Sequence, residues 1–123
     1  MTTKVELDLD SPRWGHTDRY NITLEASTLI VTMGARKAIC EWNPDEDPKW
    51  SKDLGSDALT KILKNDSIYP PQKFQSLLVR AWRSWVNGEL NDAEIETELK
   101  ELESWINAIT KATPASEYWN INF

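Results

Sequence analysis

The sequence predicts an α+β domain in which a four- or five-stranded, mostly antiparallel sheet carries about three helices packed on one face. Two observations predict it: apolar and polar residues alternate along the first third of the chain, and apolar residues recur at helical spacing along the second half. The length of 123 residues suits one domain with one core. We therefore expect a single domain over residues 1–123, with a β-meander at 1–43, helices at 56–113, and a C-terminal strand or tail at 118–123.

The first half of the chain shows four strand patterns. Residues 5–9 (VELDL) alternate strictly between apolar and acidic side chains, and residues 20–25 (YNITLE) repeat the alternation. Residues 28–33 (TLIVTM) are rich in β-branched side chains, and residues 36–42 (RKAICEW) give a fourth strand. Short links join the last three strands, which favours an antiparallel meander, while a longer loop is expected at residues 10–19 (DSPRWGHTDR).

Two sets of apolar residues predict self-association through the sheet. Ile30 and Ile39 lie on the second face of their strands, which helices on one side of the sheet would leave uncovered. Trp119, Ile121 and Phe123 alternate with asparagines at the C-terminus, so this segment can add as a strand to its own sheet or to a neighbour's. We expect a homodimer that uses these five residues, because a symmetric dimer is the commonest outcome for such surfaces.

The second half of the chain shows three helix patterns. The first begins near Ser56, a plausible N-cap. The second, from about Pro71 to Asn87, is the clearest, and Gly88 stands where a C-cap glycine belongs. Its apolar arc is wide enough to contact both the sheet and another helix. A narrow polar strip completes its surface: Ser76, Arg80, Arg83, Ser84 and Asn87.

The third helix pattern opens with Asn91 and Glu94, a variant of the capping box. Its apolar residues alternate steps of four and three, which predicts a seam against one neighbouring helix. These core positions are Ile95, Leu99, Leu102, Ile106 and Ile109. The helix is expected to end before Thr113 and Pro114.

Composition excludes several classes of function. The formal net charge of −6 disfavours a nucleic-acid partner and favours a protein partner with a basic surface. In the basic-aromatic stretch RAWRSW, Trp82 and Trp85 fall in the apolar arc and the arginines on the polar strip, so a core position is favoured over a base-stacking platform. No apolar run is long enough for a membrane span, and residues 1–10 lack the apolar region of a secretory signal. We expect a cytoplasmic protein.

The residues that most often carry chemistry are sparse. Asp45, Glu46 and Asp47 are consecutive and flanked by prolines, so they predict a solvated turn rather than a calcium loop. The single cysteine, Cys40, gives no disulfide and no zinc spacing. His16 has no neighbouring nucleophile and no second histidine. We expect no catalytic group, no metal site and no cofactor, since the chain also lacks a glycine-rich phosphate loop.

One surface is a candidate for partner binding. Glu94, Glu98, Glu101 and Trp105 share one flank of the last helix, and an acidic rim around an amphipathic ring suits a basic partner. The alternative is a solvated edge, or ion pairs from these acids to Arg80 and Arg83 across a helix pair. The full candidate surface adds two residues of the loop before the second strand and comprises Trp105, Glu94, Glu98, Glu101, Trp14 and His16.

These observations rank three functions. The first is a small, acidic, non-catalytic protein-binding module, such as a bacterial accessory, inhibitor or immunity-type protein. The second is a small-ligand-binding protein with a tryptophan-lined pocket between sheet and helices, which the seven tryptophans favour. The third is an enzyme that uses His16.

Overall fold

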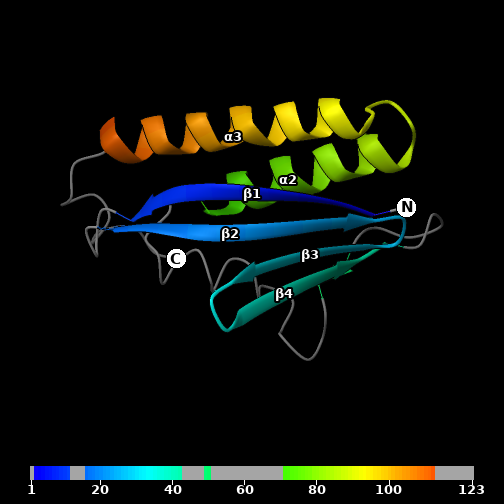
Figure 1. The fold of residues 1–123 in the computed structure, drawn as a ribbon, viewed down its shortest axis with the longest axis horizontal. Coiled ribbons are helices and arrows are strands. Elements are labelled where there is room, and N and C mark those ends of the chain that lie inside the picture. The colour runs from blue at the N-terminus through cyan, green and yellow to red at the C-terminus, as the bar shows by residue number, and fades with distance from the viewer. Residues whose placement is uncertain (1, 12–15, 43–48, 51–70, 113–123) are drawn as a thin grey trace.

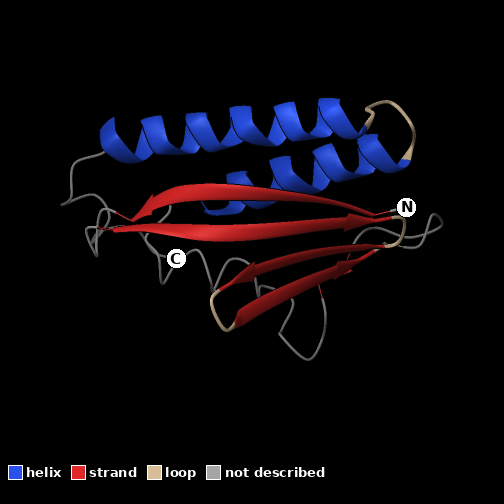
Figure 2. Cartoon of the chain, viewed as in Figure 1, coloured by secondary structure: helices blue, strands red, loops and turns tan. Residues whose placement is uncertain are grey.

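The computed structural model describes residues 2–11, 16–42, 49–50 and 71–112, and these form one sheet with two helices on the same side of it (Figures 1 and 2). In the described part of the chain, the sheet contains five strands in the order β1-β2-β3-β4-β5, which are β1 (Thr2–Ser11), β2 (His16–Glu25), β3 (Thr28–Met33), β4 (Arg36–Glu41) and β5 (Lys49–Trp50). The helices are α2 (Pro71–Val86) and α3 (Asp92–Ala112). The predicted α+β class and the antiparallel sheet are thus found. The helix expected from Ser56 and the strand or tail at 118–123 lie outside the described residues.

Every pair of neighbouring strands is antiparallel, so the sheet is a meander. The first connection is shorter than the sequence suggested, because β1 and β2 continue to the pair Ser11↔His16. Polar cross-strand contacts accompany this extension: the Thr17 hydroxyl donates to Asp10 at 3.0 Å. β5, which no sequence pattern predicted, adds only two paired residues to β4.

The alternation along the strands separates a buried face from a solvent face. Residues such as Leu7, Ile22 and Val31 point toward the helices and are fully buried, whereas their chain neighbours are partly or fully exposed. From α2, Phe74, Leu78, Trp82 and Trp85 enter the same core. From α3, four of the five predicted seam residues enter it, namely Ile95, Leu99, Leu102 and Ile106.

The fifth seam residue departs from the prediction. Ile109 is only partly buried, and the buried position in that turn is Thr110, at 3% exposure. An α-helix has 3.6 residues per turn, so a strict seven-residue pattern drifts by about 20° per heptad around a straight helix. Over the two heptads from Ile95 to Ile109 the drift is about 40°, which turns Ile109 toward the edge of the buried stripe.

Local signals fix both helix ends at the α2–α3 connection. The N–H groups of Gly88 and Glu89 donate to the carbonyls of Trp85 and Ser84 at 3.1 and 2.9 Å, and Gly88 has a φ of 79°. This is the hydrogen-bond pattern of a glycine C-cap, in which the glycine adopts the left-handed conformation. The Trp85 indole donates to Asp92 at 2.8 Å and so joins the end of α2 to the first turn of α3.

The predicted capping box is present at the start of α3. The N–H of Glu94 donates to the Asn91 side chain at 2.8 Å, and the N–H of Asn91 donates to the Glu94 carboxylate at 3.0 Å. Such a cap contributes roughly 1 kcal/mol to helix stability.

Candidate functional site

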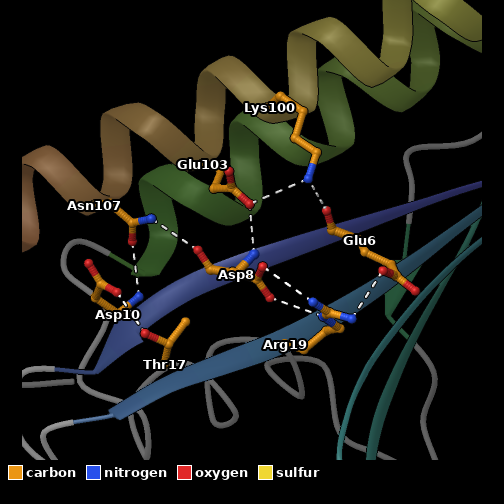
Figure 3. A network of polar contacts seen from close by, with 8 residues as sticks. All are labelled: Glu6, Asp8, Asp10, Thr17, Arg19, Lys100, Glu103 and Asn107. Atoms are coloured by element: carbon orange, nitrogen blue, oxygen red, sulfur yellow. Dashed lines mark hydrogen bonds and ion pairs between the residues drawn. The ribbon is translucent and has the colours of Figure 1, made fainter.

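Side chains of α3 occupy the outer edge of β1 (Figure 3). The N–H of Asp8 donates to Glu103 Oε2 at 2.7 Å, and the Lys100 ammonium donates to the carbonyl of Glu6 at 2.6 Å. Asn107 bonds to two strand residues at once, since its amide donates to the Asp8 carbonyl and accepts from the Asp10 N–H, each at 3.0 Å. These backbone groups lie on the side of β1 opposite β2. A further strand could pair with them there if the side chains of α3 did not.

This contact closes the β1 edge to strand addition from Glu6 to Asp10. An uncovered edge strand presents unpaired N–H and C=O groups that can pair with another chain. Here Lys100, Glu103 and Asn107 already bond to those groups. Their spacing of three and four residues keeps them on one side of α3, alongside strand residues that are spaced by two.

An ion-pair network lies on the solvent face of the same strands (Figure 3). The Arg19 guanidinium contacts Asp8 at 3.0 Å and Glu6 at 3.3 Å. The hydrogen bond from Arg19 lowers the pKa of Asp8 below its ordinary value of 3.8, and the same bond raises the pKa of Arg19. Because all three side chains are exposed, water screens the network and its contribution to stability is small.

A groove of about 640 Å³ runs between α2 and α3 on the side away from the sheet. We call it the helix groove. Its floor is formed by the apolar lining residues Leu77, Ala81, Leu90, Leu99 and Leu102, and Trp105 also lines the groove. Among the described residues, Trp105 is the large hydrophobic side chain that is exposed to solvent, at 38%. An exposed tryptophan above an apolar floor is typical of an interface anchor.

The two banks of the helix groove carry opposite charges. Glu98 and Glu101 lie on the α3 bank, and Lys73 and Arg80 lie on the α2 bank. Among the described residues, no ion pair joins the two banks, so the cross-helix pairing considered for Arg80 does not form there. The acids of the α3 bank therefore remain available to a partner.

The structure brings together only part of the predicted partner surface. Glu98, Glu101 and Trp105 line the helix groove, whereas the carboxylate of Glu94 bonds to the Asn91 N–H in the capping box. Trp14 lies outside the described residues. The backbone of His16 begins β2, opposite Ser11, but its side chain is not among those described.

Ile30 and Ile39 are direct cross-strand partners on β3 and β4, on the face turned away from the helices. Both are partly buried. The other residues predicted for self-association, Trp119, Ile121 and Phe123, lie outside the described residues. At the β4 edge, β5 pairs only with Cys40 and Glu41. Within the described residues, the rest of β4 therefore has no strand on its outer side.

A second concavity of about 650 Å³ lies between α2 and the β4–β5 edge of the sheet. Its α2 wall is the narrow polar strip that the sequence pattern of this helix predicted. We call it the arginine pocket, and its main lining residues are Ser76, Arg80, Arg83, Ser84, Asn87 and Trp50. Cys40 is also part of its lining, next to Trp50 across the β4–β5 pair.

The other chemical groups considered in the sequence are the Cys40 thiol and the candidate metal ligands. Burial raises the pKa of the Cys40 thiol to about 12, so the thiol is protonated at neutral pH. The described residues contain no group of three or more histidine, cysteine or carboxylate side chains suited to hold a metal ion. The acids at 45–47 lie outside the described residues. Neither α2 nor α3 is both long and apolar enough to cross a membrane.

Comparisons with known proteins identify relatives over nearly the whole chain. A family model described as an integron cassette protein matches residues 3–110. Among solved structures, an integron cassette protein from the mobile metagenome of V. cholerae is similar, with 35% sequence identity and a TM-score of 0.82. The similarity covers 99% of this chain and 94% of that chain. No curated protein matches the sequence.

Proposed function

The chain belongs to the integron cassette protein family, and for this member we propose the function of a non-catalytic protein-binding module. This module binds a partner with a basic surface. It acts as an accessory, inhibitor or immunity-type protein. The observation that carries the proposal is the helix groove, where the exposed ring of Trp105 lies beside Glu98 and Glu101. Hot spots of protein interfaces are enriched in tryptophan, and rim charges steer the partner.

The shape and charge of the groove define the element that it binds. A groove between two helices accepts an amphipathic helix that inserts apolar residues between them. The acids of α3 pair with basic residues on one flank of that helix. Lys73 and Arg80 on the opposite bank disfavour a helix that is basic on both flanks.

A titration with a defined probe tests this proposal. The probe is a short amphipathic helix of leucines with lysines along one flank, and the readout is the set of amide shifts in the NMR spectrum of the protein. We expect saturable shifts at residues of the helix groove. Trp105→Ala should weaken binding by roughly 30-fold or more, because truncation of a hot-spot residue costs about 2 kcal/mol.

A pair of charge reversals on α3 separates specific docking from general attraction. Glu98→Lys changes the groove bank, and Glu96→Lys makes the same change at an exposed position outside the groove lining. We expect the first variant to weaken binding and the second to leave it nearly unchanged. Equal losses in both variants, or shifts spread over the whole surface, would contradict the proposal.

The homodimer expected from the sequence remains part of the proposal, with a more restricted geometry. α3 closes the β1 edge from Glu6 to Asp10, so in the proposed dimer a strand from a second copy adds on the β4 side of the described sheet. Ile39 lies on β4 and Ile30 lies next to it on β3. Self-association through these residues leaves the helix groove free for a different partner.

A second candidate function is the binding of a small ligand between sheet and helices. The arginine pocket supports it, because this concavity lies between α2 and the β4–β5 edge of the sheet and is lined by Trp50. Its volume falls within the range of about 300–1,000 Å³ that is common for ligand sites.

A further inference from the structure

The arginine pocket contains positive charge that the rest of the described protein does not neutralise. Arg80 and Arg83 both line it, and among the described residues neither forms an ion pair with a carboxylate. The protein as a whole carries a formal charge of −6, so a concavity with two arginines that lack an ion pair among the described residues is locally positive in a protein that is negative overall. An arginine guanidinium presents a planar fork of N–H donors that matches a carboxylate or a phosphate.

A series of contacts holds one of these arginines in place. The guanidinium carbon of Arg83 lies 5.1 Å from the centroid of the Trp42 ring. That ring packs edge-to-face on Trp82 at 5.8 Å, and the Trp82 indole donates to the Glu25 carbonyl at 2.8 Å. The contact with the packed Trp42 ring restricts the Arg83 side chain and so lowers the entropy cost of binding an anion.

The remaining walls of the pocket supply weaker donors and an apolar surface. Ser76, Ser84 and Asn87 carry hydroxyl and amide groups next to the arginines. On the opposite wall, Trp50 is partly buried against the core beside Cys40. Since the Cys40 thiol is neutral at physiological pH, this wall does not repel an anion. A tryptophan ring is a suitable surface for a planar group of a ligand.

We propose that the arginine pocket binds a small organic acid, with its anionic group on Arg83 and Arg80 and a planar ring against Trp50. This inference deepens the second candidate function. It does not depend on the helix groove, because Arg83 and Trp50 lie outside the lining of that groove. Arg80 lines both concavities, so it is unsuitable as the test residue.

The test uses benzoate as the probe and benzamide as its uncharged counterpart of the same shape. The readout is the indole N–H signal of Trp50 in the NMR spectrum of the full chain, assigned with a Trp50→Phe variant. We expect a saturable shift with benzoate at a dissociation constant on the order of 1 mM, as is usual for a ligand of this size. Benzamide should produce no saturable shift.

Matched variants on α2 identify the source of the binding. Arg83→Gln should weaken benzoate binding at least tenfold, whereas Lys73→Gln removes the same charge from the helix groove and should leave it unchanged. Arg83→Lys, which keeps the charge but loses the planar fork, should weaken binding by roughly threefold and serves if Arg83→Gln does not fold. The amphipathic peptide should still bind to the helix groove of both Arg83 variants.

Three results would each overturn the inference. The first is the absence of a saturable benzoate shift in the parent protein. The second is binding of benzamide as tight as that of benzoate, which would show that charge is irrelevant. The third is an equal loss of benzoate affinity in Arg83→Gln and Lys73→Gln, which would show only a general effect of net charge.

Discussion

Asn107 offers a direct test of how α3 is held against the sheet. Its side chain forms two hydrogen bonds with β1, to the Asp8 carbonyl and from the Asp10 N–H, each 3.0 Å long. Asn107→Leu keeps a side chain of similar size and removes both bonds. The two backbone groups then lie partly buried beside an apolar side chain.

The expected loss of stability follows from the two bonds. A net contribution of about 0.5–1.5 kcal/mol for each bond gives roughly 1–3 kcal/mol in total. Leucine has a higher helix propensity than asparagine by about 0.5 kcal/mol, which offsets part of the loss. We therefore expect the free energy of unfolding to fall by about 0.5–2.5 kcal/mol.

Equilibrium unfolding in urea, followed by tryptophan fluorescence, measures this change. Ser104→Leu is the control, because it also introduces a leucine into α3, at an exposed position that forms no hydrogen bond to β1 among the described residues. The comparison of the two variants removes most of the propensity effect. If Asn107→Leu is no less stable than Ser104→Leu, the bonds to β1 contribute nothing and our account of the edge is wrong.

Three further predictions concern the core, the acidic limit of stability and self-association. Trp85 is 2% exposed, so Trp85→Ala should cost about 3–5 kcal/mol in urea unfolding. Because the pKa of Asp8 is lowered in the folded protein, the ionised carboxylate stabilises the fold above about pH 4. This stabilisation is lost as the pH falls through the pKa of Asp8 in the folded state. Thermal melts between about pH 2 and pH 5 should therefore show a smaller fall in melting temperature for Asp8→Asn than for the parent protein. Deletion of residues 118–123 should convert the proposed dimer into a monomer in sedimentation if the segment is exchanged between chains. Lost stability at unchanged mass would instead place it within one chain.

Local sequence patterns predicted most of the described elements. The alternation in residues 5–9 and 20–25 gave the buried and solvent faces of β1 and β2, and the helical spacing of Trp82 and Trp85 placed both rings in the core. Gly88 marked the end of α2. These signals work because the backbone geometry of a strand or a helix determines which neighbouring side chains share a face.

The candidate sites were harder to predict, because they combine elements that the sequence does not place side by side. The polar strip of α2 was recognised in the sequence, but its place as one wall of the arginine pocket depends on β5, which follows β4 at that edge of the sheet. Glu98, Glu101 and Trp105 were recognised as one flank of α3. The sequence already suggested Arg80 as a neighbour of these acids across a helix pair, and the structure adds Lys73 to the same bank.

The sequence by itself determined the α+β class, the faces of the strands and helices, and the helix ends at Gly88 and Asn91. Only the tertiary structure decided that β1 is an edge strand of the described sheet and that Lys100, Glu103 and Asn107 bond to its backbone. On their own helix these three residues are polar positions like any other. Their partners lie 94 to 99 positions earlier in the chain, and packing of the apolar faces of α3 and the sheet brings them together.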